Sequence, residues 1–152
     1  MVRDSIYGGL EVKSSFLLCL RIALAGLFFY AGVVKAGASQ EFAIALLPFT
    51  FIPPEWTMPL ALALSWMEIL AAILLLLPRA FPLGAALICA MCLLFIGVLS
   101  WALWNGIIVS CGCFGADDSP SAWKMLLAIG RDILLLGAAT TILALPRIGK
   151  NT

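Results

Sequence analysis

Four apolar runs, each about as long as one helical membrane crossing, occupy more than half of this 152-residue sequence. The runs cover about residues 16–34, 58–77, 82–104 and 123–145. They lack the alternation of apolar and polar residues that marks a barrel strand, and in hydrocarbon every backbone polar group must be paired within the protein. The sequence therefore predicts an all-α polytopic membrane protein, a four-transmembrane-helix bundle that forms one membrane domain over residues 1–152.

Composition agrees with a lipid bilayer as the partner and excludes several kinds of function. Hydrophobic residues make up 64% of the chain and charged residues 11%, and the mean hydropathy is +1.14, whereas a soluble domain has about 25% charged residues. The net charge of +1 comes without a basic cluster, which argues against a nucleic-acid partner. Histidine is absent, which excludes imidazole acid–base catalysis and most zinc, haem and copper(II) sites.

The segment between the first two runs differs from the runs themselves. Residues Phe42–Ile52 are apolar but too few to cross a membrane, and Pro48, Pro53 and Pro54 interrupt the region. We expect residues 36–57 to form an interfacial or re-entrant segment between the first and second spans. The short link at residues 78–82 predicts that the second and third spans form an antiparallel hairpin.

The basic residues predict an orientation in the bacterial inner (cytoplasmic) membrane. Five of them fall on the side of the two termini and of the short hairpin link, and two fall near the other side. By the positive-inside rule both termini are cytoplasmic, and the first and third connections face the periplasm. The five are Arg3, Lys13, Arg79, Arg147 and Lys150; the two are Lys35 and Lys124. The tryptophans near span ends on the periplasmic side are Trp56, Trp101, Trp104 and Trp123.

A short cysteine motif follows the third span on the predicted periplasmic side. It reads Cys111-Gly112-Cys113-Phe114-Gly115. Two cysteines one residue apart close a disulfide only with distorted geometry, and strain makes such a bond easy to exchange. Cys111 and Cys113 are therefore candidate catalytic residues for thiol–disulfide exchange. Two other interpretations stay open, namely a structural disulfide and a thiolate site for a soft metal such as copper(I).

Three further cysteines lie within the predicted spans. Cys89 and Cys92 are three residues apart and so share one helix face, and Cys19 lies at a similar shallow depth. As a set they form a candidate electron relay. The other interpretation is that they are small apolar packing residues, because an apolar span lacks the helix N-terminus that usually activates a Cys-x-x-Cys pair.

Charged residues also lie within the predicted spans, where an unpaired charge is costly. Counted from the predicted periplasmic interface, Glu68 and Arg131 fall at comparable depths, and we expect them to form an ion pair in the bundle core. The functional alternative is a polar pocket that takes a proton or a quinone head group. Arg21 lies nearer the cytoplasmic end of the first span, and Lys35 closes that span on the other side.

These residues, taken in order, resemble the MauE branch of the DoxX-like membrane proteins, a family of small four-helix redox-associated proteins. The resemblance implies a role in periplasmic thiol–disulfide exchange beside a thioredoxin-like partner. It also implies a part in the maturation of a disulfide-rich periplasmic protein such as methylamine dehydrogenase. The residues that carry it are Arg21, Phe28, Gly32, Lys35, Pro48, Glu68, the motif at 111–115, Arg131 and Asp132.

The sequence thus favours a thiol–disulfide oxidoreductase that passes electrons between Cys111 and Cys113 and a periplasmic thioredoxin-like protein. If the protein is an oxidase, a membrane quinone near Glu68 and Arg131 is the simplest electron acceptor. If it is a reductant, the membrane cysteines are the visible relay. The alternatives are a non-catalytic scaffold or assembly subunit, which docks into a larger membrane complex and has structural cysteines, and a copper(I)-handling protein.

Overall fold

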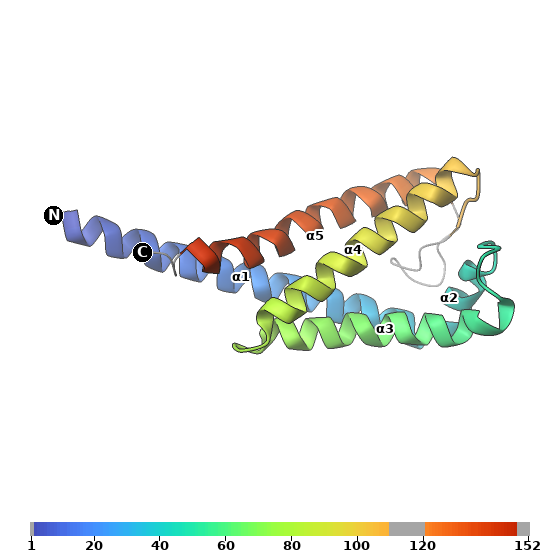
Figure 1. Ribbon diagram of the computed structural model, residues 1–152, viewed down its shortest axis with the longest axis horizontal. Helices are drawn as coiled ribbons and strands as arrows, with labels where there is room; N and C mark the ends of the chain where they lie inside the picture. The colour runs from blue at the N-terminus through green and yellow to red at the C-terminus, as the bar shows by residue number, and fades with distance from the viewer. Residues whose placement is uncertain (1, 110–120, 149–152) are drawn as a thin grey trace.

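The computed structural model describes residues 2–109 and 121–148, and in this part of the chain it contains five α-helices and no strand (Figure 1). Four helices contain stretches long and apolar enough to cross a membrane, at Ser15–Gly37, Pro54–Leu76, Phe81–Trp104 and Ala122–Ala144. The predicted all-α bundle with four spans is therefore confirmed. The helices are α1 (Val2–Gly37), α2 (Ser39–Leu46), α3 (Pro54–Leu76), α4 (Phe81–Trp104) and α5 (Ala122–Ile148).

Two helices begin earlier than the apolar runs indicate. The first helix, α1, begins at Val2 and so includes a more polar stretch before the apolar run. The third, α3, begins at Pro54, where a proline needs no amide hydrogen and its fixed φ suits the first helical position. The predicted spans are thus the apolar parts of longer helices.

The spans pack as two pairs joined by a hairpin. The main contacts are those of α1 with α3 and of α4 with α5, and α3 and α4 are antiparallel neighbours across a short turn at Pro78–Ala80. Figure 1 shows α3 and α4 close together at this turn and diverging toward the opposite end of the bundle. The predicted hairpin of the second and third spans is present.

Glycines allow the closest helix approaches. A Cβ atom at Gly84 of α4 would lie 2.4 Å from the backbone nitrogen of Leu75 in α3. A Cβ atom at Gly32 of α1 would lie 2.7 Å from Cγ1 of Ile69 and 2.9 Å from the carbonyl oxygen of Ser65. Small residues at such positions let helix backbones approach closely in membranes.

The segment between the first two spans does not cross the bundle. Its helix α2 has eight residues and packs on α3 through its buried face, which consists of Phe42, Ala43 and Leu46. Figure 1 shows α2 at the end of the bundle away from the α3–α4 turn. The same end carries the start of α3, the end of α4 and the start of α5.

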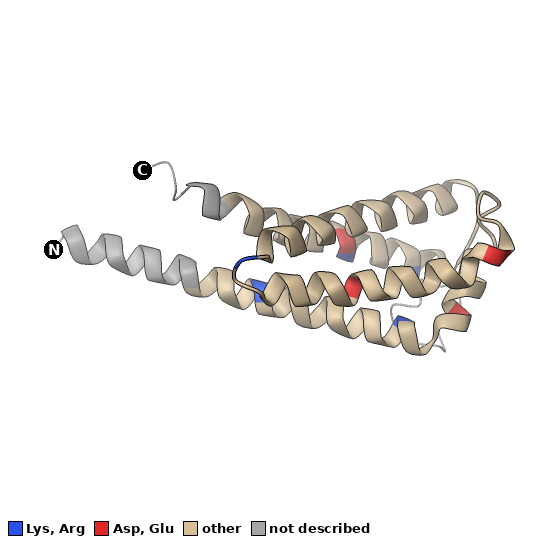
Figure 2. Ribbon diagram, turned by 60° about the horizontal axis from the view of Figure 1, so that its bottom comes forward, with Lys and Arg blue, Asp and Glu red and all other residues tan. Residues whose placement is uncertain are grey.

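The buried side chains form two clusters along the bundle. One includes Leu24, Leu75 and Ile88, and the other includes Phe42, Phe49 and Met125 and joins α2 to the spans. Many large apolar side chains are exposed instead, as expected for helices that face lipid. Figure 2 shows few charged positions along the described helices, and some of them lie in the middle of the bundle.

Candidate functional site

The cysteine motif at 111–115 lies outside the described residues, but the structure shows how the chain before it is held. The fourth helix ends in a Schellman motif: the amide of Gly106 donates to the Leu103 carbonyl at 3.1 Å, and that of Ile107 donates to the Ala102 carbonyl at 2.9 Å. Gly106 has a φ of 69°, in the left-handed region that glycine adopts without strain. This cap ends α4 and turns the chain toward Val109.

Residues on both sides of the segment at 110–120 lie in one apolar cluster. Val109 and Met125 are 7% and 1% exposed, and both belong to the cluster that contains Phe42 and Phe49. The chain that enters the motif and the helix that follows it are therefore held next to α2, at one end of the bundle.

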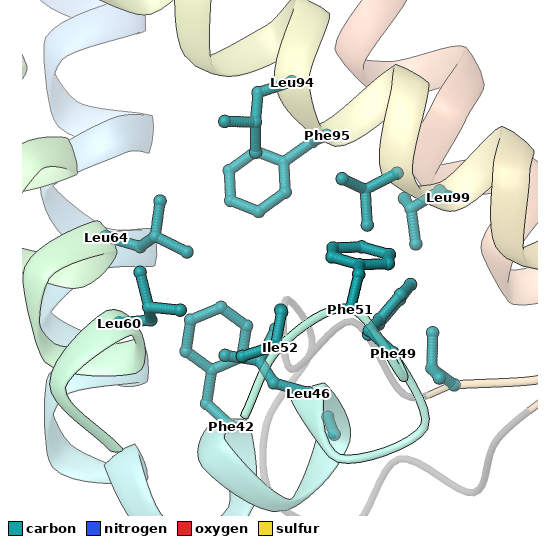
Figure 3. Close-up of a pocket in the computed structure, with 13 residues that line it drawn as sticks. Phe42, Leu46, Phe49, Phe51, Ile52, Leu60, Leu64, Leu94, Phe95 and Leu99 are labelled. Carbon is teal, nitrogen blue, oxygen red and sulfur yellow. The ribbon is translucent and has the colours of Figure 1, made fainter. Parts of the chain in front are cut away.

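An apolar pocket of about 300 Å³ lies between α2, the loop that follows it, α3 and α4. Figure 3 shows side chains from all four segments pointing into this space. Its residues are Phe42, Ala45, Leu46, Phe49, Phe51, Ile52, Leu60, Leu64, Leu94, Phe95, Val98, Leu99 and Val109. None of these side chains carries a hydrogen-bonding group, so the pocket suits a hydrocarbon ligand rather than a polar one.

A buried ion pair lies beside this pocket. The ammonium nitrogen of Lys35, in the last turn of α1, donates to Oε1 of Glu68 in α3. The two residues are 3% and 2% exposed. The close approach at Gly32 lies one turn before Lys35 and brings α1 against α3, so the two charges meet.

Two aromatic rings separate this pair from the apolar pocket. The Lys35 ammonium nitrogen lies 4.6 Å from the ring centroid of Phe95 and 5.6 Å from that of Phe42, within the range of cation–π attraction. Both phenylalanines also line the apolar pocket. Phe95 therefore forms a wall shared by the charged site and the pocket.

A second ion pair completes the charged site. Arg131 donates from Nε and Nη2 to Oδ1 of the neighbouring Asp132, at 3.0 and 2.8 Å. Asp132 is 3% exposed, and its Oδ2 is buried without a hydrogen-bond partner within the described part of the chain. A cavity of about 10 Å³ lies among Lys35, Glu68, Arg131 and Asp132, which is room for about one water molecule.

The structure adds a further residue to the predicted meeting of Glu68 and Arg131. Both residues line the same small cavity, so their comparable depth is confirmed. Glu68 also forms an ion pair with Lys35, which we had expected at the outer end of its span. The reason is that α1 continues to Gly37 and its last turn is covered by Phe42 of α2, so Lys35 points into the bundle instead of flanking it.

Arg21 has a structural role at the other end of the bundle. Its Nε and Nη2 donate to the carbonyl oxygen of Leu75 at 3.1 and 2.8 Å, and Nη2 reaches that of Leu76 at 3.4 Å. Its guanidinium carbon lies 4.5 Å from the ring centroid of Phe81. Arg21 thus satisfies carbonyls at the C-terminus of α3, where a positive charge is favoured.

The three membrane cysteines are free thiols with different surroundings. Cys19 is exposed, Cys89 is partly buried, and Cys92 is buried and lines the small charged cavity. Cys92 belongs to the apolar core and Cys89 packs against it, as small packing residues do. Within residues 2–109 and 121–148 no group of three or more potential metal-ligating His, Cys, Asp or Glu side chains occurs.

Several residues of these sites carried no usable signal in the sequence. Phe42 and Phe95 lie on different helices, and nothing in an apolar run indicates that their rings meet one ammonium group. Gly106 is different, because a glycine after asparagine at the end of an apolar run is a recognisable helix stop.

The fold and these sites belong to a class of small polytopic helical membrane proteins with a buried charged site. The family described as "Methylamine utilisation protein MauE" matches residues 13–145, which is most of the chain. The chain belongs to the MauE family. No match was found among curated proteins or among solved structures.

Proposed function

We propose that this protein carries out thiol–disulfide exchange at the periplasmic face of the bacterial inner membrane, through Cys111 and Cys113. Its partner is a periplasmic thioredoxin-like protein, and its role is the maturation of a disulfide-rich protein such as methylamine dehydrogenase. The observation that carries the proposal is the Cys-Gly-Cys pair in a chain of the methylamine-utilisation family. The burial of Val109 supports it, because it holds the chain two residues before Cys111 against the bundle.

The exchange itself needs only the two sulfurs and the partner's thiols. A thiolate of the partner attacks one sulfur of the Cys111–Cys113 disulfide, and a mixed disulfide forms while the other cysteine leaves as a thiolate. A second partner thiolate then attacks the mixed disulfide. The partner ends with a disulfide, and Cys111 and Cys113 end reduced, so two electrons have moved to the membrane protein.

The test is to trap the mixed disulfide. The partner keeps only one active-site cysteine, which is activated as a mixed disulfide with a small thiol. In Cys111→Ser and Cys113→Ser the remaining thiol attacks this bond and releases the small thiol, and neither protein then has a second active-site thiol to resolve the adduct. We expect one of these variants to accumulate a covalent adduct with a thioredoxin-like protein, visible on non-reducing gels and absent after reduction. Cys19→Ser is the matched control, because it removes an exposed thiol elsewhere in the chain.

The alternatives predict other results. If neither of these two variants forms an adduct and both support normal maturation of the partner, the cysteines are structural and the protein is a scaffold. Copper that stays bound through purification and is lost in both variants would instead favour copper(I) handling.

A further inference from the structure

We propose that the small charged cavity lined by Lys35 and Asp132 binds one internal water molecule. This water donates a hydrogen bond to Oδ2 of Asp132 and accepts one from the ammonium group of Lys35. It thereby links α5, which carries Asp132, to α1, which carries Lys35. The site goes beyond the proposed thiol chemistry and uses no residue of the motif at 111–115.

The carboxylate of Asp132 has one oxygen that the described residues leave unpaired. Asp132 is 3% exposed, and its Oδ2 is buried without a hydrogen-bond partner among residues 2–109 and 121–148. The other oxygen, Oδ1, accepts both hydrogen bonds from Arg131, at 3.0 and 2.8 Å. A carboxylate in an ion pair only accepts hydrogen bonds, and a buried acceptor without a donor costs free energy. The site therefore lacks one hydrogen-bond donor.

The cavity offers the space and the partners that one water molecule needs. Its volume of about 10 Å³ is close to that of a single water site. Asp132 supplies an acceptor. Lys35, which also lines the cavity, has three N–H donors, and one of them serves Glu68. The thiol of Cys92 lines the same cavity and is a further weak partner.

Charge and size disfavour the other occupants. The cations that line the cavity are Lys35 and Arg131, and the anions are Glu68 and Asp132. These formal charges balance, so an added ion would bring an uncompensated charge into the membrane. A lipid chain has no donor for Oδ2, and a quinone head group is far larger than one water site. Water is small, neutral and a hydrogen-bond donor.

The position of the cavity gives the water a structural role. All four spans line it, with Lys35 from α1, Glu68 from α3, Cys92 from α4 and Asp132 from α5. The main helix contacts lie within the α1–α3 pair and within the α4–α5 pair. A hydrogen bond through water is nearly as favourable in enthalpy as a direct one. A water between Lys35 and Asp132 therefore joins the two pairs in the middle of the bundle, where Figure 2 shows charged positions.

The first measurement is a structure of the full chain in a lipid phase, at a resolution that shows ordered water. We expect one water peak within hydrogen-bonding distance of both Oδ2 of Asp132 and the ammonium nitrogen of Lys35.

The second measurement is water-edited solid-state NMR of the full chain in phosphatidylcholine liposomes, with ¹³C-labelled aspartate. The side-chain carboxylate carbon of Asp132 should receive magnetisation from water although the residue lies within a span, and Asp132→Asn assigns its signal by loss. The other aspartates, Asp4, Asp117 and Asp118, lie outside the predicted spans and serve as internal controls.

Two identical substitutions on α1 provide a matched pair. Ala31 lines the cavity, whereas Ala23 is exposed and is not among the lining residues. Ala31→Val takes up the space of the water, so we expect loss of the water peak and of the magnetisation transfer to Asp132. Ala23→Val should keep both. If Ala31→Val does not fold, the two measurements on the wild type still decide the proposal.

Four results would overturn the proposal. They are an empty cavity in the wild type, a protein group that donates to Oδ2 of Asp132, a peak that grows when rubidium replaces sodium, and equal loss of the water in both valine variants. The rubidium result would identify a cation as the occupant. The double variant Cys111→Ser/Cys113→Ser should keep the water, so failure of the proposed exchange and failure of this site are separate outcomes.

Discussion

Lys35 and Glu68 are 3% and 2% exposed, and each lowers the cost of burying the charge of the other. Removing the two charges from water is costly, and the attraction between them in a low-dielectric interior offsets that cost. The rings of Phe42 and Phe95 add a favourable contact for the ammonium group. The pair therefore fixes how α1 and α3 meet.

The first prediction concerns this pair. Lys35→Met should lower the free energy of unfolding by about 3–5 kcal/mol, because it removes the ammonium group that contacts the buried Glu68 carboxylate. Combining it with Glu68→Gln should restore much of that loss, since no buried charge then remains at this contact. Unfolding in detergent measures all three variants. Additive effects of the two single substitutions would contradict the ion pair.

The second prediction concerns Arg21. Arg21→Lys should destabilise the protein by about 1–2 kcal/mol, because a lysine cannot donate in a fork to the Leu75 carbonyl and stack on Phe81 at the same time. Arg79→Lys is the matched control, since Arg79 is exposed in the turn between α3 and α4. Thermal unfolding in detergent separates them, and an equal effect of the two changes would contradict the capping role of Arg21.

At the scale of the helices, the closest packing depends on glycines, because a neighbouring helix occupies the space that a side chain would need there. Gly32 and Gly26 lie on the same helix, but a Cβ atom at Gly32 would meet Ile69 and Ser65, whereas one at Gly26 would meet nothing within 4 Å. The same substitution should therefore have opposite effects at the two positions.

The third prediction uses this contrast. Gly32→Ala should destabilise the protein by about 1–3 kcal/mol, because α1 must move away from α3 and the Lys35–Glu68 contact weakens. Gly26→Ala should be neutral or stabilising by up to about 1 kcal/mol, because alanine favours a helix more than glycine does. Unfolding in detergent measures both. A stabilising Gly32→Ala would show that α1 and α3 are not in the close contact described.

The helices themselves could largely be predicted, because four runs of the length of a membrane crossing leave few alternatives. The start of α1 at Val2 could not, since helical residues outside the membrane need no apolar pattern. The contact of Lys35 with Glu68 could not be predicted either. It depends on how α1 is rotated against α3, and helices that are apolar around most of their circumference give little indication of their packing faces.

At the scale of the whole molecule, the orientation in the membrane is a prediction from the basic residues. The structure strengthens its basis in one respect, because Lys35 lies in a buried ion pair and does not act as a flanking charge on the predicted periplasmic side. The flanking positive charges are thus still more unequal than the sequence indicates. The motif at 111–115 was found from sequence alone, while the position of Phe95 between the charged site and the apolar pocket required the fold.

The fourth prediction tests this orientation with single cysteines in an otherwise cysteine-free background. Asp117→Cys should react with an impermeant thiol reagent in intact cells, and Thr152→Cys should react only after the membrane is broken. Mass-tag gel shifts report both, and neither substitution removes a basic residue. Reaction at position 152 and none at position 117 in intact cells would reverse the orientation and place the cysteine pair in the cytoplasm.

The central claim is that Cys111 and Cys113 form an exchangeable redox pair, and its most direct test is a redox titration of that pair. The measurement uses the full chain with Cys19, Cys89 and Cys92 changed to alanine, so that thiol alkylation and mass spectrometry report only the pair. An exchange-active disulfide should show a two-electron midpoint in the range of roughly −250 to −120 mV. A midpoint below roughly −300 mV, typical of structural disulfides, or the absence of any disulfide between the two cysteines would contradict the claim.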